Sequence, residues 1–199
     1  IRDMSVQHEG KRLVYRADPA NPEHIAAVCA ALADQNITAL VHMSPLKLAS
    51  ATWAEDSYPS SQIALAAQGY FSLLQGLDAH FSTLESGVIA SVTAMDGRHG
   101  NIGERFNAVQ CAASGVTKSY AFEQLQMRCR ALDVHPELIL DPVQAAQLIH
   151  HDVFNLAGEV EVGLDRDERR WGLVAFAEDL VEDRQPLASD DTWLVSGGG

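Results

Sequence analysis

The stretch Gly87-Val88-Ile89-Ala90-Ser91-Val92-Thr93-Ala94-Met95 is an almost continuous apolar run. A run of this length and composition predicts a strand buried on both faces of a sheet. A glycine-rich loop over residues 96–103 follows it, and a long helix is expected over residues 106–125. A buried strand, a loop and a helix in this order are the repeating unit of a parallel α/β sheet.

The same alternation continues on both sides of this stretch. Asn21 and Asp141 each precede a proline, which predicts a helix that begins with a side-chain cap and Pro at its first position. The other elements that we expect are a strand over residues 13–18, a helix over 22–36, a strand over 37–43, a helix over 61–81, a strand over 128–133, a helix over 141–154, and strands over 159–163 and 171–176. This order predicts a truncated, Rossmann-like, doubly wound α/β fold. Its sheet would be mostly parallel, with helices on both faces and an antiparallel hairpin at one edge.

Composition and charge exclude several classes of function. Lys plus Arg number 14 and Asp plus Glu 27, so the formal net charge is −13. Such a chain repels the phosphates of nucleic acids and of anionic membranes. No apolar stretch approaches the roughly 20 residues of a membrane span, and from residues 1–4 we expect no signal peptide. The eight histidines show no zinc spacing, so no metal is expected. Cys29, Cys111 and Cys129 form no CxxC pair and are expected to be buried free thiols, as in a cytoplasmic protein.

A second strand-and-glycine pattern closes the chain, Thr192-Trp193-Leu194-Val195-Ser196-Gly197-Gly198-Gly199. Glycines after a buried strand allow the backbone to approach a phosphate. The glycines are either a loose tail or the opening of a cofactor-binding unit. In the second case Ser196, Gly197, Gly198 and Gly199 would contact the cofactor. We therefore expect residues 1–177 to form one unit, residues 178–191 a linker, and residues 192–199 the first strand and turn of a catalytic unit.

The helix expected over residues 106–125 resembles the active-site helix of the short-chain dehydrogenase/reductase family. That family has Tyr-x-x-x-Lys, then a glycine, a Thr-Lys-Ser-like turn and an acid. Gly115, Thr117-Lys118-Ser119 and Glu123 fit this frame. The resemblance therefore places Phe106 at the tyrosine and Gln110 at the lysine.

The catalytic groups of that family are missing at the matching positions. Phe106 has no hydroxyl to donate a proton to a carbonyl, and Gln110 has no charge to hold a ribose or to lower the pKa of a phenol. Thr93 or Ala94 stands where the family has its serine, and the Thr93 hydroxyl alone does not reduce a carbonyl. The resemblance implies a reductase fold with a degenerate active site.

Nearly the whole chain, from about residue 11 to 199, resembles the structural half of the ketoreductase domains of polyketide and polyunsaturated fatty-acid synthases. In those domains a degenerate half without cofactor precedes a catalytic half that opens with a strand and a glycine-rich loop. The matching segments are residues 110–118, the strand at 130–133, the closing hairpin at 159–163 and 170–177, and residues 193–199.

This resemblance implies a supporting role. The chain would bind no cofactor itself and would support NADPH-dependent reduction of a β-ketoacyl thioester by an adjacent catalytic half. The implied partners are that half, neighbouring synthase domains and acyl carrier protein. An unusually apolar surface would mark where the catalytic half docks. Two alternatives stay open: a Rossmann-like scaffold module, and a free-standing reductase with a rebuilt site of Thr93, His99, Arg105 and Asn107.

Overall fold

The computed structural model describes residues 4–9, 12–49, 60–103 and 105–177. Five strands form one sheet in the order β3-β4-β5-β6-β7. They are β3 (Ala39–His42), β4 (Gly87–Thr93), β5 (Met127–Val134), β6 (Glu161–Leu164) and β7 (Arg170–Gly172). The first four are parallel, and β7 runs antiparallel to β6 at the edge. The predicted mostly parallel sheet with an edge hairpin is confirmed.

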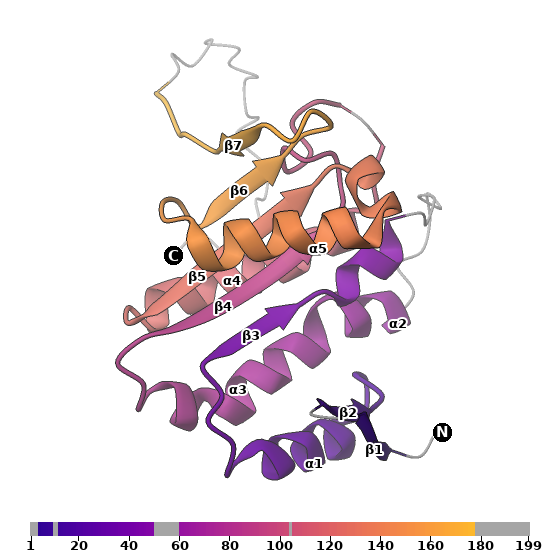
Figure 1. Ribbon diagram of the computed structural model, residues 1–199, viewed down its shortest axis with the longest axis vertical. Helices are drawn as coiled ribbons and strands as arrows, with labels where there is room; N and C mark the ends of the chain where they lie inside the picture. Colours follow the sequence, from indigo (N-terminus) through magenta and orange to yellow (C-terminus); the bar gives the residue numbers. More distant parts are fainter. Residues whose placement is uncertain (1–3, 10–11, 50–59, 104, 178–199) are drawn as a thin grey trace, which may run out of the picture.

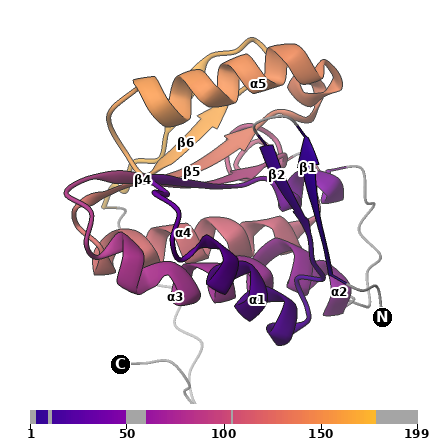
Figure 2. The same ribbon diagram turned by 60° about the horizontal axis from the view of Figure 1, so that its bottom comes forward.

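Helices cover both faces of this sheet, as Figures 1 and 2 show. The helices α1 (Pro22–Leu32), α3 (Gly69–Phe81) and α4 (Cys111–Glu123) lie on one face, and α5 (Pro142–His150) lies on the other. Neighbouring strand residues alternate between the two cores, as the pleat of a strand requires. Ile89 packs with Tyr70 and Leu74 of α3, while Ala90 packs with Ile149 of α5.

The expected helix caps are present. The Asn21 side chain accepts a hydrogen bond from the Glu23 N–H and starts α1, and the Asp141 side chain accepts from Val143 and Gln144 and starts α5. Short 3₁₀ segments, η1 (Ser44–Leu48) and η4 (Pro136–Leu140), connect strands to helices. The helix expected over 61–81 is built from α2 (Ser60–Ile63), a π-helical turn η2 (Ala64–Gln68) and α3, and α5 continues into the π-helical turn η5 (His151–Asn155).

The helix expected over residues 106–125 begins and ends inside that range. The Asn107 side chain accepts a hydrogen bond from the Val109 N–H and caps the 3₁₀ turn η3 (Ala108–Gln110), which leads into α4. The extended backbone at Asn107 therefore fixes where the helix starts, two residues later than expected.

Two expected strands differ from the structure. The strand expected over 13–18 does not join the parallel sheet. It is β2 (Arg12–Arg16), which pairs with β1 (Ser5–Glu9) in a separate antiparallel hairpin. The strand expected over 171–176 is only β7, because its pairing with β6 ends at Gly172 opposite Val162.

The cysteines are only partly as expected. Cys129 is buried and Cys29 is half-buried, but Cys111 at the start of α4 is exposed. Burial raises the pKa of the Cys129 thiol to about 11. The expectation of three buried thiols is therefore wrong for Cys111, because the first turn of α4 leaves this side of the helix open to solvent.

The expected linker over residues 178–191 and the expected strand and turn over 192–199, with Ser196, Gly197, Gly198 and Gly199, lie outside the described residues. Their assignment stays a prediction. Among the helices that the structure describes, none has both the length and the apolar character needed to cross a membrane.

Candidate functional site

Three aspartates lie where the parallel strands β4, β5 and β6 end. Asp133 belongs to the end of β5, Asp96 follows β4, and Asp165 follows β6. All three are buried. In open parallel sheets this edge is where ligands usually bind. A buried carboxylate must be paired or hydrogen-bonded, so the partners of these three groups decide what the edge can do.

Asp133 is fully hydrogen-bonded by its own chain. One carboxylate oxygen accepts from the Thr93 hydroxyl and from the Met95 N–H, each at 2.8 Å. The other accepts from the His99 N–H at 3.0 Å and the Asp96 N–H at 3.4 Å. These bonds join the end of β5 to the end of β4 and to the loop that follows it.

Asp96 organises that loop. Its carboxylate accepts from the backbone N–H groups of Arg98 and Gly100, each at 2.8 Å, and from that of Ile102 at 3.1 Å. Burial by itself would raise the pKa of Asp96, but the three backbone donors outweigh it and hold the pKa below its ordinary value. Asp96 therefore stays ionised and fixes residues 96–102 in one conformation.

Asp165 closes the edge at β6. It accepts from the Arg98 guanidinium at 3.0 Å, from the Trp171 indole N–H at 2.8 Å, and from the N–H groups of Asp167 and Arg169. Burial opposes its ionisation, but these donors lower its pKa to about 2. The Arg98 guanidinium also stacks on the Trp171 ring, 3.7 Å from the ring centroid.

The loop after β4 lies directly against the end of β6. A Cβ atom on Gly163 would collide with the Gly97 carbonyl, and one on Gly97 would collide with the Leu164 carbonyl. Gly97 also has φ of 73°, a conformation that favours glycine. This backbone-to-backbone contact places protein where a ligand would otherwise approach the strand ends.

The three positions singled out by the family resemblance have structural partners here. The Thr93 hydroxyl donates to Asp133. Gln110 is fully buried, and its carboxamide bonds both the N–H and the C=O of Ala94. The Phe106 ring lies over Gly100, where an added Cβ would be 2.6 Å from its Cζ. Their match to the family's catalytic positions stays a prediction.

The four residues of the rebuilt-site alternative do not converge. Thr93 and His99 both bond to Asp133, one through its hydroxyl and the other through its backbone N–H. Asn107 is buried, caps η3 and donates to Gln62 at 2.9 Å. Arg105 is exposed to solvent. The structure thus brings two of the four residues together, Thr93 and His99, and both donate hydrogen bonds to the Asp133 carboxylate.

At the described ends of β4, β5 and β6 three carboxylates are buried, and the nearby Arg98 is paired with Asp165. Within the described residues no group of three or more His, Cys, Asp or Glu side chains could hold a metal ion. The three carboxylates accept hydrogen bonds from the chain itself, and those made by Asp96 and Asp133 fix the loop that follows β4.

Sequence reasoning did not single out Asp96, Asp133 or Asp165. Each aspartate stands at or just after the end of an expected strand. This shared position could have identified them as candidate site residues from the sequence. Their donors are mostly backbone N–H groups of turns, which a sequence pattern does not reveal.

A groove between α3 and α4 is the second notable surface. It has a volume of about 390 Å³ and is lined by Phe71, Leu74, Gln75, Asp78, Ala112, Gly115, Val116, Ser119, Tyr120 and Glu123. Phe71 is 55% exposed, and a Cβ added at Gly115 would meet open space. At one side of the groove, the Tyr120 hydroxyl and the Gln124 amide donate to Asp78. The groove therefore has apolar lining residues, among them Leu74 and Val116, beside the half-buried carboxylate of Asp78.

Comparison with known proteins places the fold. No family model and no curated protein matches the sequence. The chain is similar to a short-chain dehydrogenase from Mycobacterium smegmatis, with a TM-score of 0.52 and 14% identity over 73% of this chain and 65% of that one. It is also similar to the adenylation, ketoreductase and pseudo-Asub multidomain structure of a keto acid-selecting NRPS module, with a TM-score of 0.53 and 13% identity over 77% of this chain and 12% of that one.

A third match is a metagenomic short-chain oxidoreductase in complex with NADP, with a TM-score of 0.48 and 19% identity over 66% of this chain and 64% of that one. The chain therefore spans less than two thirds of the length of both single short-chain oxidoreductases. The two likenesses with TM-scores of 0.53 and 0.52 show the fold, which is a Rossmann-like α/β fold as in short-chain dehydrogenases.

Proposed function

We propose that this chain is the structural, non-catalytic half of a ketoreductase domain in a multidomain polyketide or polyunsaturated fatty-acid synthase. It supports an adjacent catalytic half that reduces a β-ketoacyl thioester on acyl carrier protein with NADPH. The Rossmann-like fold agrees with this proposal, and a ketoreductase-containing multidomain protein is among the similar structures.

The observation that carries the proposal is the hydrogen bonding of the Gln110 side chain inside the protein. In the resemblance this position is the catalytic lysine, and here the side chain is buried and bonded to both backbone groups of Ala94. The neighbouring Thr93 hydroxyl is likewise bonded to Asp133. Because both polar groups already have partners inside the protein, they are not free to orient a substrate or a nicotinamide ribose.

The groove between α3 and α4 is the docking surface in this proposal. Phe71 at its rim is more than half exposed, and large exposed apolar surfaces mark contacts with partners. Ala112, Gly115 and Ser119 are small and let another backbone approach closely. We assign the groove to a helix of the catalytic half, with a basic side chain that meets Asp78.

Cofactor binding is the first test. The purified chain is titrated with NADPH by calorimetry, and we expect no binding. The same titration with the catalytic half of the same synthase is the positive control. Micromolar binding of NADPH by this chain alone would overturn the structural-half proposal and favour the reductase with a rebuilt site.

Association is the second test. The chain and the separately expressed catalytic half should co-purify and restore ketone-dependent NADPH oxidation. A Cβ at Gly115 has no neighbour within 4 Å, so Gly115→Leu should project into the groove and abolish co-purification while thermal stability is kept. Val174→Leu, at a position 82% exposed outside the groove, is the matched control. If the two halves never associate, the result contradicts the structural-half proposal and favours the alternative that the chain is a scaffold module.

A further inference from the structure

The hairpin of β1 and β2 stands apart from the rest of the fold. It forms a two-stranded sheet of its own, and none of the side chains that the structure describes on its strands is buried. Among the described residues, no backbone group of either strand bonds to another element. Figures 1 and 2 show the hairpin beside α1, at one end of the molecule. A two-stranded hairpin is at best marginally stable by itself, and further strands with an apolar face stabilise it.

The base of the hairpin is fixed to the body of the protein. The Asp18 N–H donates to the His24 ring at 3.1 Å, and the Asp18 carboxylate accepts from the Ala20 N–H at 2.9 Å. Pro19 lies against α3, where a Cβ atom added at Gly69 would be 2.5 Å from the Pro19 Cβ. The hairpin is therefore presented in one orientation, which lowers the cost of binding a partner.

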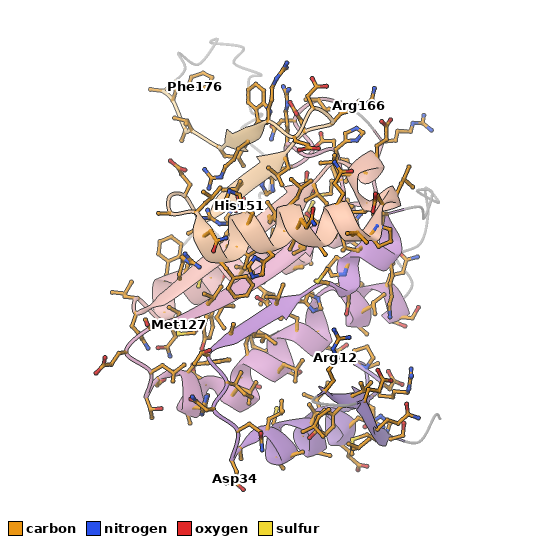
Figure 3. All side chains as sticks on the ribbon, in the orientation of Figure 1. Arg12, Asp34, Met127, His151, Arg166 and Phe176 are labelled. Carbon is orange, nitrogen blue, oxygen red and sulfur yellow. The ribbon has the colours of Figure 1, made fainter. Side chains whose placement is uncertain are left out.

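The two edges of the hairpin differ in charge. β2 carries Arg12 and Arg16, both exposed, and Figure 3 marks the first of them by its label. β1 has no arginine, lysine or proline, and its one acid, Glu9, is its last residue. Charges, prolines and bulges are the usual means that keep an edge strand from pairing, and the β1–β2 register has no bulge. The β1 edge is therefore the one open to another strand.

We propose that β1 of a second copy of this chain pairs with this edge, so that the two hairpins form one four-stranded antiparallel sheet. A two-fold axis at Gln7 pairs every residue of β1 with a residue of β1 in the second copy. Gln7 then faces Gln7 of the second copy, and Ser5 faces Glu9 of the second copy. No like charges stand opposite each other, which would be unfavourable in a sheet. A two-fold interface must be self-complementary, and this register has that property.

The hydrogen bonding of the hairpin fits the same register. Glu9 and Arg12 are the pair next to the two-residue connection, and residues at this spacing in a turn are joined by a hydrogen bond. Bonded and non-bonded pairs alternate along an antiparallel ladder, so the N–H and C=O groups of Val6 and His8 point away from β2. The proposed register sets Val6 opposite His8 of the second copy. These outward groups therefore bond to each other.

Charge also favours a second copy at this place. Two chains with a net charge of −13 repel each other over most of their surface. The two strands of the hairpin, in contrast, hold two arginines and one glutamate. Pairing through β2 is disfavoured, because a two-fold axis at Val14 would set Arg12 against Arg16 of the second copy.

Pairing also doubles an apolar face. Val6 and Leu13 are 45% and 42% exposed. Both share one face of the hairpin with Tyr15, because Val6 is opposite Tyr15 and Leu13 is two residues from it. In the four-stranded sheet these side chains of both copies lie on the same face. The dimer thus supplies the strands and the apolar face that the isolated hairpin lacks.

The size of the contact sets its strength. β1 has five residues, so it is about 17 Å long. One pair of such strands buries less than the roughly 800 Å² per partner of a standard interface. We therefore expect a weak dimer that forms as the protein concentration rises, and not a permanent one.

Disulfide cross-linking of the full chain tests the register. Gln7→Cys places two cysteines opposite each other at the two-fold axis, with Cα atoms about 5 Å apart, which suits a disulfide. Glu9→Cys, at a position on the same strand that is also exposed, places its two cysteines about 14 Å apart. Both variants also carry Cys111→Ser, which removes the exposed native thiol. Oxidation should give a covalent dimer with Gln7→Cys and much less with Glu9→Cys.

Sedimentation equilibrium tests the affinity. Gln7→Lys sets two cations opposite each other and should raise the dimer dissociation constant by about tenfold or more. Gln35→Lys, at an exposed position after α1, adds the same charge and should change nothing.

Three results would overturn the proposal. The first is that oxidation gives no more dimer with Gln7→Cys than with Glu9→Cys. The second is a dimer that is insensitive to Gln7→Lys. The third is that Gln7→Lys abolishes co-purification with the catalytic half, because the β1 edge would then bind that partner and not a second copy.

Discussion

Gln110 and Ala94 form a closed pair of hydrogen bonds. The Gln110 carboxamide oxygen accepts from the Ala94 N–H at 2.8 Å, and its amide nitrogen donates to the Ala94 carbonyl at 3.1 Å. Gln110 is fully buried and leads into α4, while Ala94 follows β4. This pair ties the start of α4 to the end of β4 at the position where the resemblance expects a lysine.

The first prediction concerns the stability that this pair supplies. Gln110→Leu leaves a buried N–H and a buried C=O of Ala94 without partners, so we expect a loss of about 3 kcal/mol in the free energy of unfolding. Urea denaturation measures it. Gln75→Leu, at an exposed position on α3, is the control and should stay within about 0.5 kcal/mol of the parent. Equal effects of the two substitutions would contradict a structural use of Gln110.

The second prediction restores the two catalytic residue types. Phe106→Tyr with Gln110→Lys should give neither NADPH binding nor ketone reduction, because the carboxylates at the strand ends and the Thr93–Asp133 bond remain. A lysine at the fully buried position of Gln110 should also lower stability. NADPH titration and circular dichroism measure both effects. Reductase activity in a folded double variant would show that two changes suffice to rebuild a working site.

The third prediction concerns the loop held by Asp133. Asp133→Asn replaces one acceptor oxygen by a donor, so at least one of its donors, among them Thr93 and His99, loses its partner. We expect a loss of about 2 kcal/mol in unfolding free energy and faster hydrogen exchange at the His99 N–H. The control is Asp167→Asn. Its side chain is 63% exposed and pairs only at the surface with Arg169, so its effect should be below about 1 kcal/mol.

The sheet could be predicted from the sequence because its interior strands β4 and β5 are mostly buried. Residues 87–95 are an apolar run of strand length that begins with glycine. Residues 128–133 include Arg128, Arg130 and Asp133 and lie between two helical patterns; both segments form interior strands of the sheet. The hairpin of β1 and β2 was not foreseen, because its strands are partly polar and pack on no parallel neighbour. Its separation from the main sheet depends on tertiary contacts, which a local pattern does not contain.

The candidate site was predictable only in outline. The missing hydroxyl of Phe106 and the missing charge of Gln110 can be read from the sequence. That Gln110 bonds the Ala94 backbone, and that Asp96 gathers three backbone N–H groups, depends on the exact path of the loop over residues 96–103. Four residues of that loop, including the non-glycine residue His99, have positive φ. The backbone conformation of such a loop cannot be predicted from the identity of its single residues.

The fourth prediction is a pH dependence from His42. Burial against Tyr70 lowers the pKa of His42 from 6.5 to about 4, although its hydrogen bond to the Ala66 carbonyl acts in the other direction. The unfolded chain binds the proton more readily, so this contribution to stability is complete above pH 6.5 and is lost as the pH falls toward 4. Its size is up to about 3 kcal/mol. His42→Phe should flatten this part of the stability curve, whereas His151→Gln, at an exposed position, should not.

The last prediction uses two glycines with opposite surroundings. A methyl group on Gly163 collides with the Gly97 carbonyl, and because that neighbour is backbone it cannot turn away. Gly163→Ala must therefore push the loop off the end of β6, and we expect a loss of at least about 3 kcal/mol. Gly115 lies inside α4 with open space at its Cβ position, so Gly115→Ala should raise stability by up to about 1 kcal/mol, because alanine favours the helix. Urea denaturation of the two variants measures both values. If Gly163→Ala were as stable as the parent, the loop would not be held against β6, and the strand ends would be open to a ligand after all.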